Sequence, residues 1–150
     1  MVEKSTPRIY VFIITEMKNQ KNLKIRLSKY FNRYIRLKEC LETTGSTTSG
    51  FCFTCNAHKP FGELDAGHFM AGKNNSVKFI EENVHIQCKR CNYFERGNLI
   101  PYTLRMIEKY GQEKVNELQK IKKQAQKFTD SELEELIKIY KLKVKEYENN

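Results

Sequence analysis

The sequence contains no tryptophan, only three prolines and seven glycines, and no apolar run long enough to cross a membrane. The run from Ile9 to Ile14 is far shorter than the roughly 20 residues that a spanning helix needs. At the N-terminus, a charged n-region, a long apolar h-region and a small-residue cleavage site are all missing, which argues against a secretory signal peptide. We therefore expect a cytoplasmic protein with no membrane partner.

Acidic residues are also few compared with basic ones, and the chain therefore has a net charge of +9. The excess is concentrated in residues 1–50, which carry ten Lys or Arg against four Asp or Glu. Such an excess points to a polyanionic partner such as nucleic acid, since phosphates dominate nucleic-acid affinity. The alternative is a basic composition that only keeps the protein soluble. The length of 150 residues fits one domain, or one compact core with helical arms.

The chain has five cysteines, an odd number. An odd number without a secretory signal argues against a disulfide framework. Four of the five form two Cys-x-x-Cys pairs, Cys52 with Cys55 and Cys88 with Cys91. Two residues between thiolates let both sulfurs face one tetrahedral Zn²⁺, and two such pairs complete a closed, structural Cys₄ site. A redox role is the alternative, but no thioredoxin-like βαβ pattern accompanies the pairs. We expect Cys40, the fifth, to be a small buried hydrophobe.

Residues 1–50 are predicted to form a strand followed by a basic helix. The β-branched and aromatic run Arg8–Thr15 favours a strand. From Lys21 to about Leu41 the spacing is helical, with one apolar stripe made of Leu23, Leu27, Tyr30, Phe31, Tyr34, Leu37 and Leu41. A second stripe is entirely basic and consists of Arg26, Lys29, Arg33 and Arg36. It is either a DNA-backbone contact or an ordinary solvated face. The Gly/Ser/Thr-rich segment Thr43–Gly50 is predicted to be a flexible joint.

Residues 101–150 are predicted to be helical. Pro101 suits a first helical turn and Gly111 a helix stop. A second helix is expected over Lys114–Lys127, and a capping box places Thr129 at the N-cap of a third. The third helix has an apolar stripe made of Leu133, Leu136, Ile137, Tyr140, Val144 and Tyr147. This helical arm could pack on the core, form a dimer element or clamp DNA.

The span between the two cysteine pairs, with the residue just after it, contains the components of a metal-assisted hydrolase: Asp65, His68, Asn83, His85 and Asn92. Histidine is the best general base near neutral pH, and amide and carboxylate oxygens are hard ligands that Mg²⁺ accepts. A zinc site would hold the hairpin that carries His68 close to a helix beginning near Asn92. Singly, each residue is commonplace; in combination they favour a catalytic site.

This segment resembles the HNH, or His-Me finger, nuclease family. In that family a His on the first strand of a hairpin activates water, a middle Asn fixes the hairpin loop, and a His or Asn on the following helix binds metal. The resemblance implies that His68, Asn83 and Asn92 fill these three roles in order. The pattern Cys88-x-x-Cys91-Asn92 is also similar to the end of zinc-bearing Holliday-junction resolvases of the endonuclease VII type.

A closer resemblance, over roughly residues 27 to 118, is to the NinG/Rap recombination proteins of lambda-like phages. It is carried by Phe31-Asn-Arg-Tyr-Ile-Arg-Leu-Lys38, Ala66-Gly-His-Phe69, Asn83-Val-His-Ile-Gln-Cys-Lys-Arg-Cys-Asn92, Gly97-Asn98 and Tyr102. The family implies a structure-specific DNA endonuclease acting on branched recombination intermediates, Holliday junctions and D-loops, in the host cytoplasm if the protein is phage-encoded.

The expected fold is therefore α+β. A zinc-stapled ββα-metal core over residues 51–100 would be flanked by the strand and basic helix of residues 1–50 and by the helical arm of residues 101–150. Many HNH proteins place an acidic metal ligand directly before the catalytic His, but here that position is Gly67 and the nearest carboxylate is Asp65. Side chains alternate between the two faces of a strand, and this alternation does not exclude Asp65 as a metal ligand. However, Asp65 lies two residues further along the strand than an acid directly before His68, which moves its carboxylate several ångströms. A β-bulge at Ala66–Gly67 could correct this.

In the mechanism that the resemblance implies, Asn92, with Asp65 as a candidate second ligand, holds Mg²⁺ or Mn²⁺ against the scissile phosphate. His68 takes a proton from the attacking water, and Asn83 secures the loop by side-chain to backbone hydrogen bonds. His85 could orient His68, contact phosphate or be structural. The basic residues near the second cysteine pair, expected to contact the DNA backbone, are Lys89, Arg90 and Arg96.

Two other functions stay open. A non-catalytic zinc module that binds DNA and recruits recombination partners needs the cysteines and the basic helix, but not His68 or Asn92. A sequence-specific HNH homing or restriction nuclease shares the chemistry but needs a recognition domain. Cutting both arms of a junction would favour a homodimer, because the substrate is symmetric.

Overall fold

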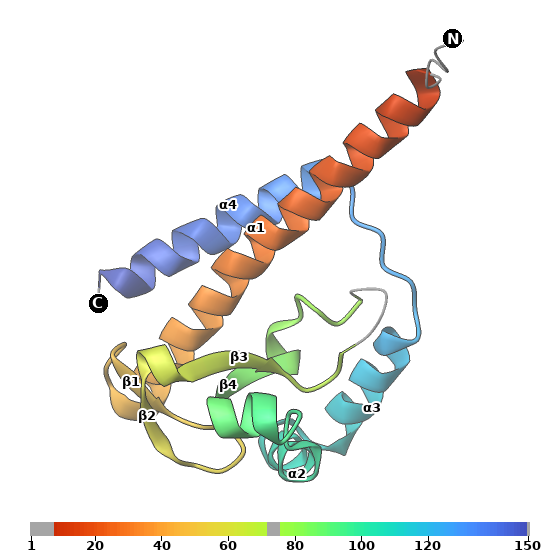
Figure 1. Ribbon diagram of the computed structural model, residues 1–150. Coiled ribbons are helices and arrows are strands. Elements are labelled where there is room, and N and C mark those ends of the chain that lie inside the picture. The colour runs from red at the N-terminus through yellow and green to blue at the C-terminus, as the bar shows by residue number, and fades with distance from the viewer. Residues whose placement is uncertain (1–7, 72–75, 150) are drawn as a thin grey trace.

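The computed structural model describes residues 8–71 and 76–149, and shows a mostly helical α+β protein with two small antiparallel sheets (Figure 1). The helices are α1 (Arg8–Thr44), α2 (Leu99–Tyr110), α3 (Gln112–Lys122) and α4 (Asp130–Glu148). The strands are β1 (Ser49–Phe51), β2 (His58–Pro60), β3 (Leu64–His68) and β4 (Val84–Cys88). Short helical turns are η1 (Phe61–Glu63), η2 (Glu81–Asn83) and the π-helical η3 (Arg90–Phe94). None of the helices in the described ranges has the length and apolarity needed to cross a bilayer.

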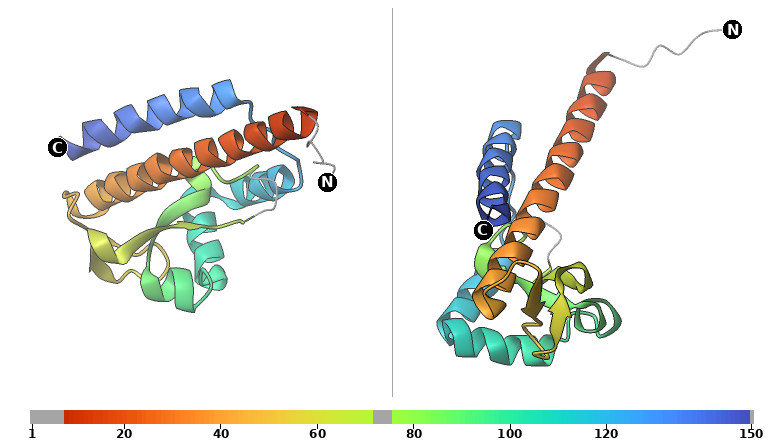
Figure 2. Two further views of the ribbon diagram at one scale, coloured as in Figure 1. Left: turned by 45° about the horizontal axis from the view of Figure 1, so that its top comes forward. Right: turned by 90° about the vertical axis from the view of Figure 1, so that its left-hand side faces the viewer.

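The predicted strand at Arg8–Thr15 is wrong, because these residues are the first turns of α1. A strand needs a neighbour to satisfy its backbone groups, and no described strand pairs with this segment. A helix satisfies them locally, and these turns continue into the strongly periodic stretch that follows. The turns extend beyond the rest of the molecule (Figure 2), and their apolar side chains are exposed, 71% for Ile9 and 47% for Ile14.

The predicted apolar stripe of α1 is confirmed from Leu23 to Leu37 as one side of the main core, with Tyr30 partly buried, whereas Leu41 is not part of this cluster. The other side is α4, which lies along α1 in the same direction (Figures 1 and 2): Asn19 meets Asp130 near one end and Arg33 meets Glu148 near the other. Between them Phe31 packs edge-on against Tyr140, with ring centroids 5.0 Å apart. The C-terminal helix is thus a packing element of the core.

The predicted capping box of α4 is also confirmed. The Thr129 hydroxyl accepts a hydrogen bond from the Glu132 backbone N–H at 3.2 Å, and the Glu132 carboxylate accepts one from the Thr129 N–H at 2.7 Å. The sequence also predicted Pro101 in a first turn and Gly111 at a helix stop, and both are correct in α2. The next helix begins and ends earlier than the predicted 114–127, because Gly111, at φ 85°, both ends α2 and begins α3.

The carboxylate of Glu81 connects the β region to both long helices. It accepts hydrogen bonds from Lys143 of α4 at 2.7 Å and from Tyr34 of α1 at 3.2 Å, and lies near Lys38. Burial alone would raise the pKa of Glu81, but the two lysines and the tyrosine hydroxyl hold it below its ordinary value. The ionised carboxylate therefore fixes the position at which the chain enters β4.

The two hairpins have different roles. The first, β1 with β2, is short, and β1 already begins inside the predicted flexible joint. The second pairs Leu64 with Cys88 at one end and His68 with Val84 at the other. Strand β4 is buried along its whole length and lies next to α1, where Ile86 and Leu64 cover Cys40. The predicted burial of Cys40 is confirmed, and the rigid second hairpin carries the candidate site.

Candidate functional site

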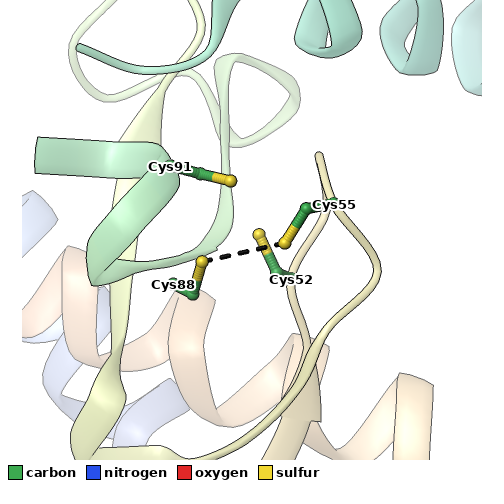
Figure 3. A group of neighbouring side chains, drawn as sticks. All are labelled: Cys52, Cys55, Cys88 and Cys91. Carbon is green, nitrogen blue, oxygen red and sulfur yellow. Dashed lines mark hydrogen bonds between the residues drawn. The ribbon is translucent and has the colours of Figure 1, made fainter. Parts of the chain in front are cut away.

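The four paired cysteines meet at one point (Figure 3). Cys52 and Cys55 lie on the turn between β1 and β2, Cys88 ends β4, and Cys91 lies on η3. Their sulfurs are all within 4.8 Å of one another, and those of Cys55 and Cys88 are 3.8 Å apart. Sulfurs about 2.3 Å from a tetrahedral zinc would be about 3.8 Å apart. The predicted cluster is thus confirmed, and it could hold a metal ion such as zinc.

The thiols of the cluster differ in pKa: burial raises the pKa of Cys55 to about 12 and also raises that of Cys88, whereas Cys52 is shifted toward the thiolate form that a metal requires. Burial would raise the pKa of Cys52, but hydrogen bonds with backbone groups of Cys55 and Cys88 and with the Thr54 hydroxyl, 3.3 Å away, lower it to about 7. The side-chain amide of Asn98 donates to the sulfur of Cys91 at 3.4 Å. Because both pairs converge on one centre, a shared metal site accounts for them better than two separate redox pairs.

Asn83 holds the loop of the second hairpin, as the sequence predicted. The residue is fully buried directly before β4. Its amide oxygen accepts a hydrogen bond from the Met70 N–H at 3.0 Å, and its amide nitrogen donates to the carbonyls of Met70 and Val77, each at 2.9 Å. One side chain therefore ties the segment leaving β3 to the segment entering β4, and so fixes the end of the strand that carries His68.

His68 is oriented by the backbone of the same loop. Its Nε2 lies 2.9 Å from the carbonyl oxygen of Lys78. A carbonyl only accepts, so Nε2 carries the proton and Nδ1 is left as an acceptor. Burial lowers the pKa of His68, the Lys78 ammonium adds to this, and hydrogen bonds to backbone groups of Lys78 and Ala66 only partly oppose it. The imidazole is therefore held neutral near pH 7, with one nitrogen able to take up a proton.

His68 and Asn92 line the same pocket, of about 510 Å³, together with Lys78 and Arg96. The side-chain amide of Asn92 donates to Asp65 at 3.2 Å, and the other carboxylate oxygen of Asp65 forms an ion pair with Lys89. Asp65 itself is not part of the described pocket lining and reaches it through Asn92. The two residues on which the nuclease hypothesis depends are therefore brought together. The helix expected to begin near Asn92 is the π-helical turn η3, and α2 starts later.

Comparison with known proteins places the chain in a family. The family described as "Bacteriophage Lambda NinG protein" matches residues 10–150. The chain belongs to the NinG family. It is 36% identical to "Protein ninG" of Escherichia phage lambda over 69 residues, which cover 45% of this chain and 33% of that relative. It is 31% identical to "Protein ninG" of Salmonella phage P22 over 96 residues, 63% of this chain and 46% of the relative.

The chain thus spans about a third of the length of the lambda relative. It is also 36% identical to "Protein ninG" of Escherichia phage 933W, over 34% of the length of that relative. No solved structure matches this chain significantly. Membership of the NinG family confirms the resemblance drawn from the motifs of residues 27 to 118.

A close approach explains why this NinG-family chain has glycine before His68. A Cβ at Gly67 would lie 2.0 Å from the side-chain oxygen of Gln87 on β4. Gln87 is fully buried, and its amide nitrogen donates to the Thr54 hydroxyl at 3.2 Å and to the Gly97 carbonyl at 2.9 Å. It connects the first cysteine turn to the loop after η3. The position directly before His68 is thus closed to a larger side chain by a structural amide.

Gly67→Ala is expected to destabilise the protein by about 1–3 kcal/mol, the usual cost of overpacking, because Gln87 cannot move without losing both hydrogen bonds. Urea unfolding measures the change. Gly62→Ala is the matched control, since a Cβ there would meet nothing within 4 Å. The double variant Gly67→Ala/Gln87→Ala should be more stable than the sum of the single changes, because the overlap is then gone. A wild-type midpoint for Gly67→Ala would show that Gln87 is free to move.

His85 lies in the core, away from the pocket of His68. Its Nδ1 is hydrogen-bonded to the carboxylate of Glu39 on α1, and the other oxygen of Glu39 accepts from the Ile86 backbone N–H at 2.7 Å. The imidazole stacks on Phe53, with ring centroids 4.0 Å apart. Of the three predicted roles, the structure therefore supports the structural one: His85 joins β4 to α1 and to the first cysteine turn.

The predicted basic stripe on α1 is not one free surface, which corrects that expectation in part. Arg36 lies over the Phe61 ring, 3.9 Å from its centroid, and donates to the Phe61 carbonyl at 2.6 Å. Burial lowers the pKa of Arg36. Arg33 pairs with Glu148 at 2.5 Å. Within this stripe, only Arg26 and Lys29 are exposed and form no salt bridge to another described residue.

The basic residues near the second cysteine pair also differ from one another. Lys89 pairs with Asp65, and Arg90 with Glu95 at 2.7 Å, whereas Arg96 lines the pocket. Of the three, Arg96 is therefore the one already directed to the candidate site.

The roles of Lys78 and Gln87 were not predicted. Lys78 orients His68 through a backbone carbonyl, which any residue possesses. Gln87 lies inside the motif Asn83–Asn92, but its partners Thr54 and Gly97 belong to two other motifs, and the spacing within a motif does not show which residues of another motif it contacts.

Proposed function

We propose that this chain is a metal-dependent, structure-specific DNA endonuclease with an HNH-type ββα-metal core, acting on branched recombination intermediates such as Holliday junctions and D-loops. The observation that carries the proposal is the shared pocket: a neutral, oriented His68 faces the same space as the amide of Asn92. In this proposal β3, β4 and η3 are the two strands and the helical turn of the nuclease core, and the cysteine cluster holds them in place with zinc.

His68 is the general base. Its Nδ1 takes a proton from the attacking water, while Nε2–H stays bonded to the Lys78 carbonyl. That carbonyl fixes the ring and also stabilises the imidazolium once it forms. The half-buried position and lowered pKa of His68 keep the base unprotonated before the reaction. The expected products carry a 5′ phosphate and a 3′ hydroxyl.

Asn92 and Asp65 would hold the catalytic Mg²⁺ or Mn²⁺. The donor set fits, because both offer hard oxygens, and Mg²⁺ commonly uses one or two protein ligands with water and phosphate oxygens completing its shell. The Asn92 nitrogen donates to Asp65, so the Asn92 oxygen is the atom of this amide that would bind the ion. Lys89 already supplies a positive charge to Asp65 at this place. When bound, the metal would stabilise the charge that develops on the leaving 3′ oxygen.

The test is cleavage of a labelled synthetic four-way junction by the purified protein in Mg²⁺ or Mn²⁺, compared with the same reaction in a chelator specific for these ions. A linear duplex with the sequence of one arm is the matched substrate. We expect metal-dependent nicks in the junction that DNA ligase can reseal, and little cutting of the duplex. Binding without cutting would instead support a zinc-dependent accessory module, and cutting of the duplex at one sequence would support a homing or restriction nuclease.

A further inference from the structure

A second groove adjoins the candidate catalytic pocket. It has a volume of about 880 Å³ and lies between α1, the loop of the second hairpin and the start of α4. Its lysines are Lys21 and Lys24 on α1 and Lys78 on the hairpin loop. Lys78 lines both this groove and the pocket of His68 and Asn92, so the two hollows meet at this residue.

The lysines of the groove outnumber its acidic residues, which are Glu16 and Asp130. In the part of the chain that the structure describes, none of the three lysines forms a salt bridge, and Asp130 accepts a hydrogen bond from Asn19 at 2.5 Å. Burial, followed by repulsion from Lys24, lowers the pKa of Lys78. The lining is therefore net positive, and a bound polyanion would relieve the repulsion between Lys24 and Lys78.

The lysines of the groove and the predicted basic stripe lie on different sides of α1. At about 100° per residue, Lys24 and Arg26 are about 160° apart around the helix. Lys24 lies one seven-residue step before Phe31, whose ring contacts Phe79 on the hairpin side, with centroids 5.6 Å apart. The exposed Arg26 and Lys29 instead face away from the pocket of His68.

We propose that Lys21, Lys24 and Lys78 form a track for the phosphodiester backbone of one DNA arm, leading along α1 away from the pocket of His68 and Asn92. This inference deepens the proposed endonuclease function and rests on it for the position of the scissile phosphate. The ammonium groups contact phosphates and read no bases, so the track fixes the direction in which the arm leaves the site. Arg96 continues the same positive lining at the other end.

The experiment compares Lys21→Gln/Lys24→Gln with Arg26→Gln/Lys29→Gln, two variants with the same net charge and changes on the same helix. Binding to a fluorescent four-way junction is measured without divalent catalytic metal, from about 50 to about 200 mM salt, where phosphate contacts are strongly salt-dependent. Each lost phosphate contact should lower the slope of log affinity against log salt by about 1, so the lysine pair should lower it by about 2. The arginine-lysine control pair should leave the slope unchanged. Circular dichroism confirms that both variants fold.

A lowered slope in the control variant alone would overturn the track and assign the interface to the opposite side of α1, and equal losses in both would also overturn it. Absence of DNA binding by the wild-type protein has the same consequence. Because binding is measured without cleavage, the two proposals fail separately. If binding depends on the lysines but the protein cuts no junction, the track stands and the endonuclease proposal is rejected. If the protein cuts the junction but the lysine variant has an unaltered salt slope, the endonuclease proposal stands and the track is rejected.

Discussion

His68→Ala is expected to lower the rate of junction cleavage by about 10²–10⁴-fold, the usual contribution of a positioned general base, while leaving DNA affinity unchanged. The reason is that Nδ1 of His68 is the one imidazole nitrogen in the pocket that lacks a proton and is oriented, through Nε2, by the Lys78 carbonyl. Single-turnover cleavage separates this loss of chemistry from any change in binding.

Two further variants make the result specific. His68→Gln retains an N–H that can donate to the Lys78 carbonyl but supplies no base, so it should be as slow as alanine if the imidazole acts in catalysis, and near wild type if His68 only holds the loop. His58→Ala is the matched control, because His58 is exposed on β2, outside the pocket lining, with its imidazole hydrogen-bonded to Ser49 at 3.0 Å. Wild-type cleavage by both His68 variants would remove the base from the proposal.

The parts of the fold that the sequence predicted are those set by local spacing. The helical period of residues 21–41, the capping box at Thr129 and the two Cys-x-x-Cys pairs each act over a few residues, and each is found as expected. Asn83 makes side-chain to backbone hydrogen bonds with the hairpin loop, the kind of contact that the sequence predicts for it.

The errors come from contacts between segments far apart in the chain. The run Arg8–Thr15 has strand propensity, but no described strand accepts it as a neighbour, so it continues α1. Arg33 and Arg36 look like free charges until Glu148 and Phe61 fold against them. Propensity and periodicity carry no information about such partners, whereas tertiary packing decides whether a charge is free to bind phosphate.

The same distinction applies to Asp65. Counted along the strand, two extra residues move its carboxylate several ångströms from the position directly before His68. The register of β3 with β4 is regular through Ala66 and Gly67, so the β-bulge that could have corrected this is absent. Asp65 instead accepts a hydrogen bond from the Asn92 side-chain amide at 3.2 Å and lies outside the described pocket lining. Gln87 completes this arrangement by filling the space beside Gly67.

Removing the metal from the cysteine cluster is expected to unfold the first hairpin and the segment around η3, and so to abolish cleavage. The strands β1 and β2 have only three residues each, and the cluster of Cys52, Cys88 and Cys91 is a separate small core that a metal would hold together. Structural zinc sites contribute about 10–16 kcal/mol, comparable to or larger than the whole stability of a small domain, about 5–15 kcal/mol. Metal analysis of the purified protein should return one zinc per chain.

Cys88→Ser should lose zinc and melt at a lower temperature, whereas Cys40→Ala, at the buried cysteine outside the cluster, should keep zinc and lose only part of its stability. Because Cys91 and Asn92 are adjacent on η3, loss of the cluster should free Asn92 from the pocket that it shares with His68. Chelated protein should therefore recover junction cleavage when Zn²⁺ is returned together with Mg²⁺, and not with Mg²⁺ alone. Two results would contradict this: recovery of junction cleavage with Mg²⁺ alone, or unchanged amide-exchange protection of β4 after chelation. Either would show that the second hairpin and its pocket stay folded without metal at the cysteine site.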